Sequence, residues 1–151
     1  MDIDLLLAIG HHLVVFLLVG ILAAEFAVLR PGLSGSRIGQ LARIDAAYGA
    51  VAALVILVGV FRVIFGASGW EYYVANYVFW AKMAAFLVMG LLTIPPTLAI
   101  RRWLKASQSD AGYRVPEAEI ASSRRYIHLQ AGVLVLIPIF AAAMARGYGI
   151  A

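Results

Sequence analysis

The sequence has 151 residues, enough for one domain, and 64% of them are hydrophobic while 13% are charged. This balance excludes a soluble globular domain and indicates an all-α integral membrane protein. The absence of cysteine excludes disulfides, thiolate metal sites and covalent c-type haem, and the basic residues behind the net charge of +4 lie in short connections, which favours contact with a lipid bilayer over nucleic acid.

Four apolar stretches predict transmembrane helices, because each is near the ~20 residues that cross a bilayer core. In chain order they cover residues 5–29, 45–65, 78–100 and 128–145 of a single transmembrane domain, residues 1–151. Residues 101–127 are predicted to form a cytoplasmic loop, in which Pro116 and the acidic residues after it indicate that the fourth helix begins ahead of the membrane. Pro95, Pro96 and Pro138 remove helical hydrogen bonds, so we expect kinks there.

The charges of the connections predict the orientation of the helices. Residues 30–44 carry three arginines and residues 101–127 carry most of the other basic residues, whereas the N-terminal tail and residues 66–77 carry acidic ones only. The positive-inside rule then predicts an antiparallel four-helix bundle in a bacterial inner (cytoplasmic) membrane, crossed several times, with both termini in the periplasm. Aromatic residues are expected to mark the inner interface at Trp103 and the outer one at Trp70, Tyr72, Tyr73, Tyr77 and Trp80.

Residues spaced three and four apart predict which face of each helix looks inward. In chain order, these faces are His11, Leu18 and Glu25; then Asp45, Tyr48, Ala52, Val55, Gly59, Arg62 and Gly66; then Lys82, Ala85, Met89 and Pro96; and finally His128, Gly132, Val135, Ile139, Ala142 and Arg146. We expect the four faces to meet along one bundle axis.

The ionisable groups inside the helices fall into two layers when the rise of about 1.5 Å per residue is applied. The inner layer, expected to be structural, contains Glu25, Asp45 and His128, and the outer layer contains His11 or His12, Arg62, Lys82 and Arg146. The inner layer holds charges of both signs, whereas the outer layer has no acid within the membrane. This imbalance predicts an anionic guest, although the outer cations can alternatively extend to the interface.

The adjacent histidines His11 and His12 are the leading functional candidates, because ionisable side chains inside hydrocarbon are costly. They point about 100° apart on a helix, so one can face the interior as a haem ligand, a metal ligand, a proton carrier or a structural hydrogen-bond partner. A bare metal ion is least favoured, because no second ligand lies at the same depth. For haem b, one imidazole would bind the iron, Arg62 and Lys82 would meet the propionates, and Lys82, Met89, water or no group would be the second ligand.

The number of histidines limits the cofactor content. The chain has three histidines, and His128 lies ~27 Å along the axis from Arg146 in the outer layer, so it is too deep to share an iron with His11. A cytochrome with two haems and four histidine ligands is excluded, and one b-type haem is the most that the sequence accommodates.

Two family resemblances follow from particular segments. The segments Ile9–Gly32 and Gly66–Thr97, together with the final ARGYG, resemble an uncharacterised family of small bacterial predicted membrane proteins over nearly the whole chain. An early histidine, Gly20 and the element Trp80-Ala81-Lys82 more distantly resemble the small membrane type of protoporphyrinogen IX oxidase and the copper-resistance D membrane domain. The second resemblance implies haem b and a redox role, with His11 or His12 and Lys82 at the key positions.

The sequence thus predicts a haem-binding redox protein that transfers electrons or oxidises a porphyrinogen or a quinol-like substrate. The alternative is a non-catalytic helper or scaffold subunit, in a homo-oligomer or a larger membrane complex, whose outer cations dock an acidic group or a lipid headgroup. Transport of a proton or small solute is less favoured, because His11 and Glu25 are ~21 Å apart with no polar residue between them on that stripe.

Overall fold

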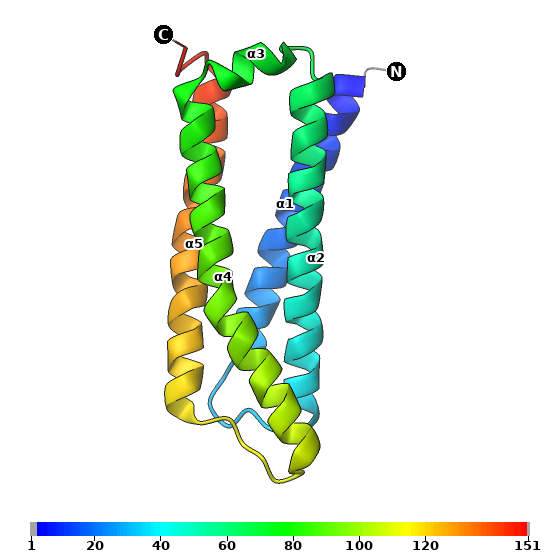
Figure 1. The fold of residues 1–151 in the computed structure, drawn as a ribbon, viewed down its shortest axis with the longest axis vertical. Helices are drawn as coiled ribbons and strands as arrows, with labels where there is room; N and C mark the ends of the chain where they lie inside the picture. Colours follow the sequence, from blue (N-terminus) through cyan, green and yellow to red (C-terminus); the bar gives the residue numbers. More distant parts are fainter. Residues whose placement is uncertain (1–2, 151) are drawn as a thin grey trace.

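The structure is a computed structural model that describes residues 3–150, and the regular elements of these residues are all helices. The helices are α1 (Ile3–Val28), α2 (Ser36–Phe65), α3 (Gly69–Val74), α4 (Tyr77–Ser109) and α5 (Glu117–Ala145) (Figure 1). Within residues 3–150, α1, α2, α4 and α5 are long and apolar enough to cross a membrane. The predicted all-α fold with four membrane-capable helices is therefore confirmed.

The four long helices form two pairs. Helix α1 packs along α2, and α4 packs along α5, while α4 also contacts α2. Figure 1 shows short helix α3 crossing from one pair to the other at the end where α1 begins and α5 finishes. We call this end the outer end, and the opposite end, with the connections 29–35 and 110–116, the inner end.

The helices extend well beyond the apolar stretches from which they were predicted. The predicted loop 101–127 is wrong in most of its length, because α4 continues to Ser109 and α5 begins at Glu117. Hydropathy marks only the part of a helix that lies in lipid, while the charged turns beyond it are made of good helix formers. The predicted early start of the fourth helix is confirmed, with Pro116 at its N-cap position.

The inner end is closed by buried groups. The amide of Val115 donates to the carbonyl of Leu33 at 3.0 Å, which joins the two inner connections. Trp103 is 0% exposed, and its indole N–H donates to Glu119 at 2.7 Å. The prediction that Trp103 belongs to an interfacial belt is therefore wrong, because a carboxylate partner inside the fold satisfies the indole.

Helix α4 changes direction part way along, so that it lies beside α5 in one half and slants toward the start of α2 in the other (Figure 1). Pro95 and Pro96 lie inside this helix, and Pro96 cannot donate to the carbonyl of Leu92 one turn earlier. The side-chain amide of Gln130 on α5 donates to that carbonyl at 3.3 Å and accepts from the Thr93 hydroxyl at 3.1 Å. A polar side chain of the neighbouring helix thus replaces the missing backbone donor.

The predicted inward faces are confirmed on α1, α2 and α4 but not on α5. Leu18, Glu25, Asp45, Val55, Ala85 and Met89 are all buried. On α5 the buried residues include Ile127, Gln130, Leu134 and Ile137, whereas His128, Val135 and Ile139 are exposed. The prediction for α5 was wrong by one residue, or about 100° around the helix, because the face toward lipid is as apolar as the face toward the bundle.

At the outer end, the chain that follows α5 folds onto the start of α4. Asn76 is 0% exposed, and its side-chain oxygen accepts from the amides of Val78 and Phe79, which caps α4. Its side-chain amide donates to the carbonyl of Tyr148 at 3.1 Å, and the amide of Tyr77 donates to the carbonyl of Gly149 at 3.0 Å. These contacts attach the start of α4 to the chain that follows α5.

Candidate functional site

A cavity of about 270 Å³ lies between the two helix pairs, toward the outer end. Its lining is mostly aliphatic and aromatic, with residues such as Val15, Leu18, Val55, Phe86, Leu134 and Ile137. Four side chains with polar or charged groups also line it: His11, Arg62, Tyr73 and Lys82. The cavity therefore combines an apolar body with a cationic portion, as small-molecule sites commonly do.

The structure distinguishes the two histidines that the sequence left equivalent. His11 lines the cavity, and its Nδ1 is buried without a hydrogen-bond partner among residues 3–150. His12 is exposed on the other face of α1, where its Nδ1–H donates to the carbonyl of Ala8 at 2.7 Å. His11 is therefore the histidine available to a ligand. Its ring lies over Gly59 of α2, where an added Cβ would be 3.5 Å away.

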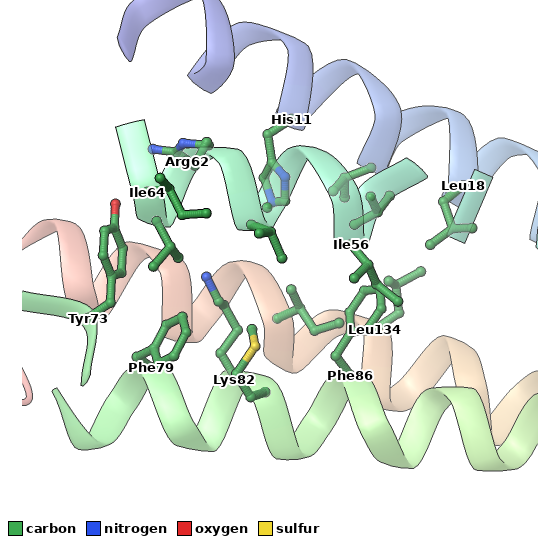
Figure 2. A pocket seen from close by; sticks show the side chains of 17 residues that line it. His11, Leu18, Ile56, Arg62, Ile64, Tyr73, Phe79, Lys82, Phe86 and Leu134 are labelled. Carbon is green, nitrogen blue, oxygen red and sulfur yellow. The ribbon is translucent and has the colours of Figure 1, made fainter. Parts of the chain in front are cut away.

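The two predicted cations Arg62 and Lys82 both reach the cavity. Figure 2 shows His11 of α1 and Lys82 of α4 pointing into the pocket from opposite sides, with Arg62 on α2. Lys82 is half-buried, and its ammonium group lies 5.5 Å from the centre of the Phe79 ring. The Nε of Arg62 is buried and has no hydrogen-bond partner in the described chain. The side chains that line the cavity include no acid, as the predicted imbalance of charge requires.

Other predicted site residues are not brought to the cavity. Met89 is buried in the core, ~10 Å deeper along α4 than Lys82 by helical rise, and it does not line the cavity. Arg146 is exposed after the end of α5, as expected for a residue that extends to the interface. Instead, Met83 and Tyr73 line the cavity. Met83 follows Lys82 directly and could have been found from that neighbour, whereas short helix α3, which brings Tyr73, gave no sequence signal.

Two of the three residues predicted for the inner polar layer are buried in the bundle. Glu25 and Asp45 are 3% and 8% exposed, and Asp45 accepts a hydrogen bond from the Thr97 hydroxyl at 2.6 Å. His128 is exposed, and its ring packs edge-on against Phe26, with 4.7 Å between the ring centres. The placement of His128 in this layer was wrong because it followed from the incorrect face of α5.

The inner layer also contains several neutral groups that the sequence pattern did not indicate. Tyr48, predicted only as a packing residue, is 2% exposed, and its hydroxyl is buried. Thr93, Thr97 and Gln130 also point into the bundle and form the hydrogen bonds described above. Uncharged polar residues inside an apolar stretch are themselves a signal of an inward face, and Gln130 would have identified the correct face of α5.

The described residues offer no cluster of three or more His, Cys, Asp or Glu side chains for a metal ion. The donor set of the cavity is compatible with haem b. It provides one unpartnered imidazole nitrogen, two cations for carboxylates and an apolar surround. The volume of about 270 Å³ is below the ~300–1,000 Å³ typical of small-molecule sites. A tetrapyrrole therefore requires rim side chains such as Ile56 and Ile64, which are largely exposed, to turn outward.

The fold and the cavity define a class: a multi-pass helical membrane protein with four membrane-capable helices among its described residues and a cation-lined site between them. The chain belongs to the family described as Predicted membrane protein (DUF2214), which matches residues 3–149. No curated protein and no solved structure matches the chain. The resemblance to an uncharacterised membrane protein family is thereby confirmed.

Proposed function

We propose that this protein binds one b-type haem in the cavity and takes part in electron transfer or in the oxidation of a porphyrinogen or quinol-like substrate. The observation that supports the proposal most directly is His11 Nδ1, which is buried in the cavity without a partner in the described chain. An unpartnered buried polar group typically costs ~1–3 kcal/mol. A ligand bound to the His11 Nδ1 atom would remove this cost.

The chain's own residues divide the task of holding this cofactor. His11 would hold the iron, and Lys82 and Arg62 would pair with the propionates. Met83 rather than Met89 is the methionine placed to offer a thioether, because it lines the cavity. The aliphatic lining would keep water away from a bound haem. Haem b, when bound, supplies one-electron chemistry.

We further propose that the helices form an antiparallel bundle in a bacterial inner membrane, with the inner end in the cytoplasm. The arginines of residues 30–44 and 101–127, at the inner end, support this orientation by the positive-inside rule. The cavity would then lie in the periplasmic half of the membrane, where a soluble or membrane-bound electron partner on that side has access.

The test is an absorption spectrum of protein expressed with ample haem and purified in mild detergent. We expect a Soret band and a haemochrome assay close to one haem per chain. His11→Ala should lose most of the bound haem, because it removes the only histidine that lines the cavity. His12→Ala is the matched control and should retain haem, because His12 is on the exposed face.

The same experiment separates the alternatives. No Soret band in the wild-type protein, together with unchanged stability of His11→Ala, would overturn the proposal. Equal loss of haem in both histidine variants would contradict the assignment of His11. A haem-free protein that is extracted gently as part of a larger complex would instead support the helper or scaffold role.

A further inference from the structure

A wide, open groove at the inner end lies between the end of α1 and the start of α5, and the proposed haem site does not use it. The residues that line the groove include Arg30, just after α1, and Arg124, Arg125 and His128 of α5. Among the described residues of this lining, Glu117 is the acidic one. Three arginines and one carboxylate give the groove an excess of positive charge.

The contacts of Arg124 hold one wall of the groove in place. Its guanidinium group lies over the ring of Phe26, 3.9 Å from the ring centre, and its Nη1 donates to the carbonyls of Phe26 and Leu29 at 3.2 and 2.6 Å. The Nδ1–H of His128 donates to the carbonyl of Arg124 at 2.9 Å. The Nε and Nη2 groups of Arg124 form no hydrogen bond within residues 3–150. A fixed guanidinium with spare donors is pre-organised to bind phosphate oxygens.

The other two arginines of the groove are available to an anion. Arg30 and Arg125 are exposed, and neither forms an ion pair in the part of the chain that the structure describes. The ion pair found at the inner end joins Arg102 to Glu119 instead. The described chain therefore does not neutralise the positive charge of this groove.

The position of the groove along the helices indicates an anion that is itself part of the membrane. The apolar stretch of α1 ends just before Arg30, and α5 carries no charged residue from Leu129 to its end at Ala145. The groove thus spans the boundary between charged and apolar surface, which is the level of lipid headgroups. Leu129 lines the groove and is 51% exposed, so an apolar surface leads from the arginines toward the acyl chains.

We propose that this groove binds the headgroup of one anionic phospholipid. Arg30, Arg124 and Arg125 hold the phosphate, and an acyl chain runs along α5 past Leu129. Basic pockets between helices at the cytoplasmic side of membrane proteins commonly bind such headgroups. The site is separate from the cavity, because Phe26 lies ~22 Å from His11 along α1.

The test is native mass spectrometry of the full chain in mild detergent, with dioleoyl phosphatidylglycerol or dioleoyl phosphatidylcholine added at equal concentrations. We expect one phosphatidylglycerol to be retained per chain and phosphatidylcholine to be lost. Phosphatidylglycerol should also raise the temperature of thermal unfolding in the same detergent, whereas sodium phosphate should not. Equal retention of the two lipids would overturn the proposal, and an equal thermal effect of sodium phosphate would assign the groove to a soluble anion instead.

A matched pair of double variants separates this groove from the general positive charge of the inner end. Arg30→Gln with Arg125→Gln removes two exposed cations of the groove and should weaken retention of phosphatidylglycerol about tenfold or more. Arg37→Gln with Arg43→Gln removes the same charge from exposed positions of α2 that do not line the groove, and should retain the lipid. Equal losses in both double variants would contradict a specific site. None of these measurements depends on haem.

Discussion

Gly149 shows how one residue position can hold an end of the bundle together. Its backbone has φ of 99°, in the left-handed region that favours glycine. A Cβ at this position would overlap the side-chain oxygen of Asn76 and approach a methyl carbon of Val78 to 2.7 Å. The tail can therefore close over the start of α4 only with glycine here.

We predict that Gly149→Ala lowers the free energy of unfolding by roughly 2–4 kcal/mol, because it adds backbone strain and displaces the α4 cap. Gly147→Ala is the matched control. Gly147 also has a positive φ, 82°, but an added Cβ meets nothing within 4 Å, so only about 1 kcal/mol of strain is expected. Denaturant titration in micelles measures both, and equal losses would contradict the role assigned to Asn76.

At the same scale, the sequence predicted which cationic side chains line the cavity but not which of the two histidines does. His11, Arg62 and Lys82 were all recognised as groups that hydrocarbon does not tolerate without a reason, and all three line the cavity. The choice between His11 and His12 depended on the rotation of α1 against α2. In the structure the His11 ring lies over Gly59 of α2, a contact between helices that no local pattern around the histidines encodes.

At the scale of the element, helix α4 depends on α5 to complete its backbone hydrogen bonding. We predict that Gln130→Leu costs roughly 1–2 kcal/mol of unfolding free energy, because the Leu92 carbonyl loses its donor, while the Thr93 hydroxyl still donates to the carbonyl of Met89. In a Pro96→Ala background, the restored amide can bond to Leu92 within the helix. The cost of Gln130→Leu should then be smaller by ~0.5 kcal/mol or more.

A double-mutant cycle of these two changes, followed by thermal or denaturant unfolding, measures the coupling. An identical cost of Gln130→Leu in both backgrounds would mean that Gln130 does not compensate for Pro96. The cycle has the further advantage that a general packing defect from leucine would appear in both backgrounds and cancel.

Element boundaries and faces were predictable only where polarity varies. The inward faces of α1, α2 and α4 carry Glu25, Asp45 or Lys82, which cannot all face lipid without cost. On α5 the sequence offered His128 and Gln130 two positions apart, on different faces. His128 lies close enough to the inner interface to be tolerated outside, packed on Phe26, so the neutral Gln130 was the better guide.

At the scale of the whole molecule, the absence of cysteine makes the proposed orientation directly testable. Ser68 at the outer end and Ser109 at the inner end are both exposed. We predict that a membrane-impermeant maleimide labels Ser68→Cys in intact spheroplasts, and labels Ser109→Cys only after the membrane is permeabilised. The cysteine-free parent chain controls for background, and the reverse pattern would place the inner end in the periplasm.

The overall number and order of the membrane helices followed from composition alone, because a bilayer imposes a length and a polarity on each crossing. The cavity could not be predicted from composition. It exists because α1 packs on α2 and α4 on α5, while α3 spans the two pairs at the outer end (Figure 1). Such an arrangement depends on contacts between residues far apart in sequence, and neither spacing nor charge predicts it.

The rim of the cavity gives the site an unusual environment for capturing a ligand. Ile56, Val60 and Ile64 line the cavity and are also exposed on α2 within the membrane-capable part of the chain. A guest can therefore arrive by lateral diffusion through the acyl chains without crossing water. A lipid-soluble compound is concentrated in the bilayer by partitioning, so a modest intrinsic affinity would be enough to keep the site filled, and the hydrophobicity of a compound would contribute to selection before any contact with His11.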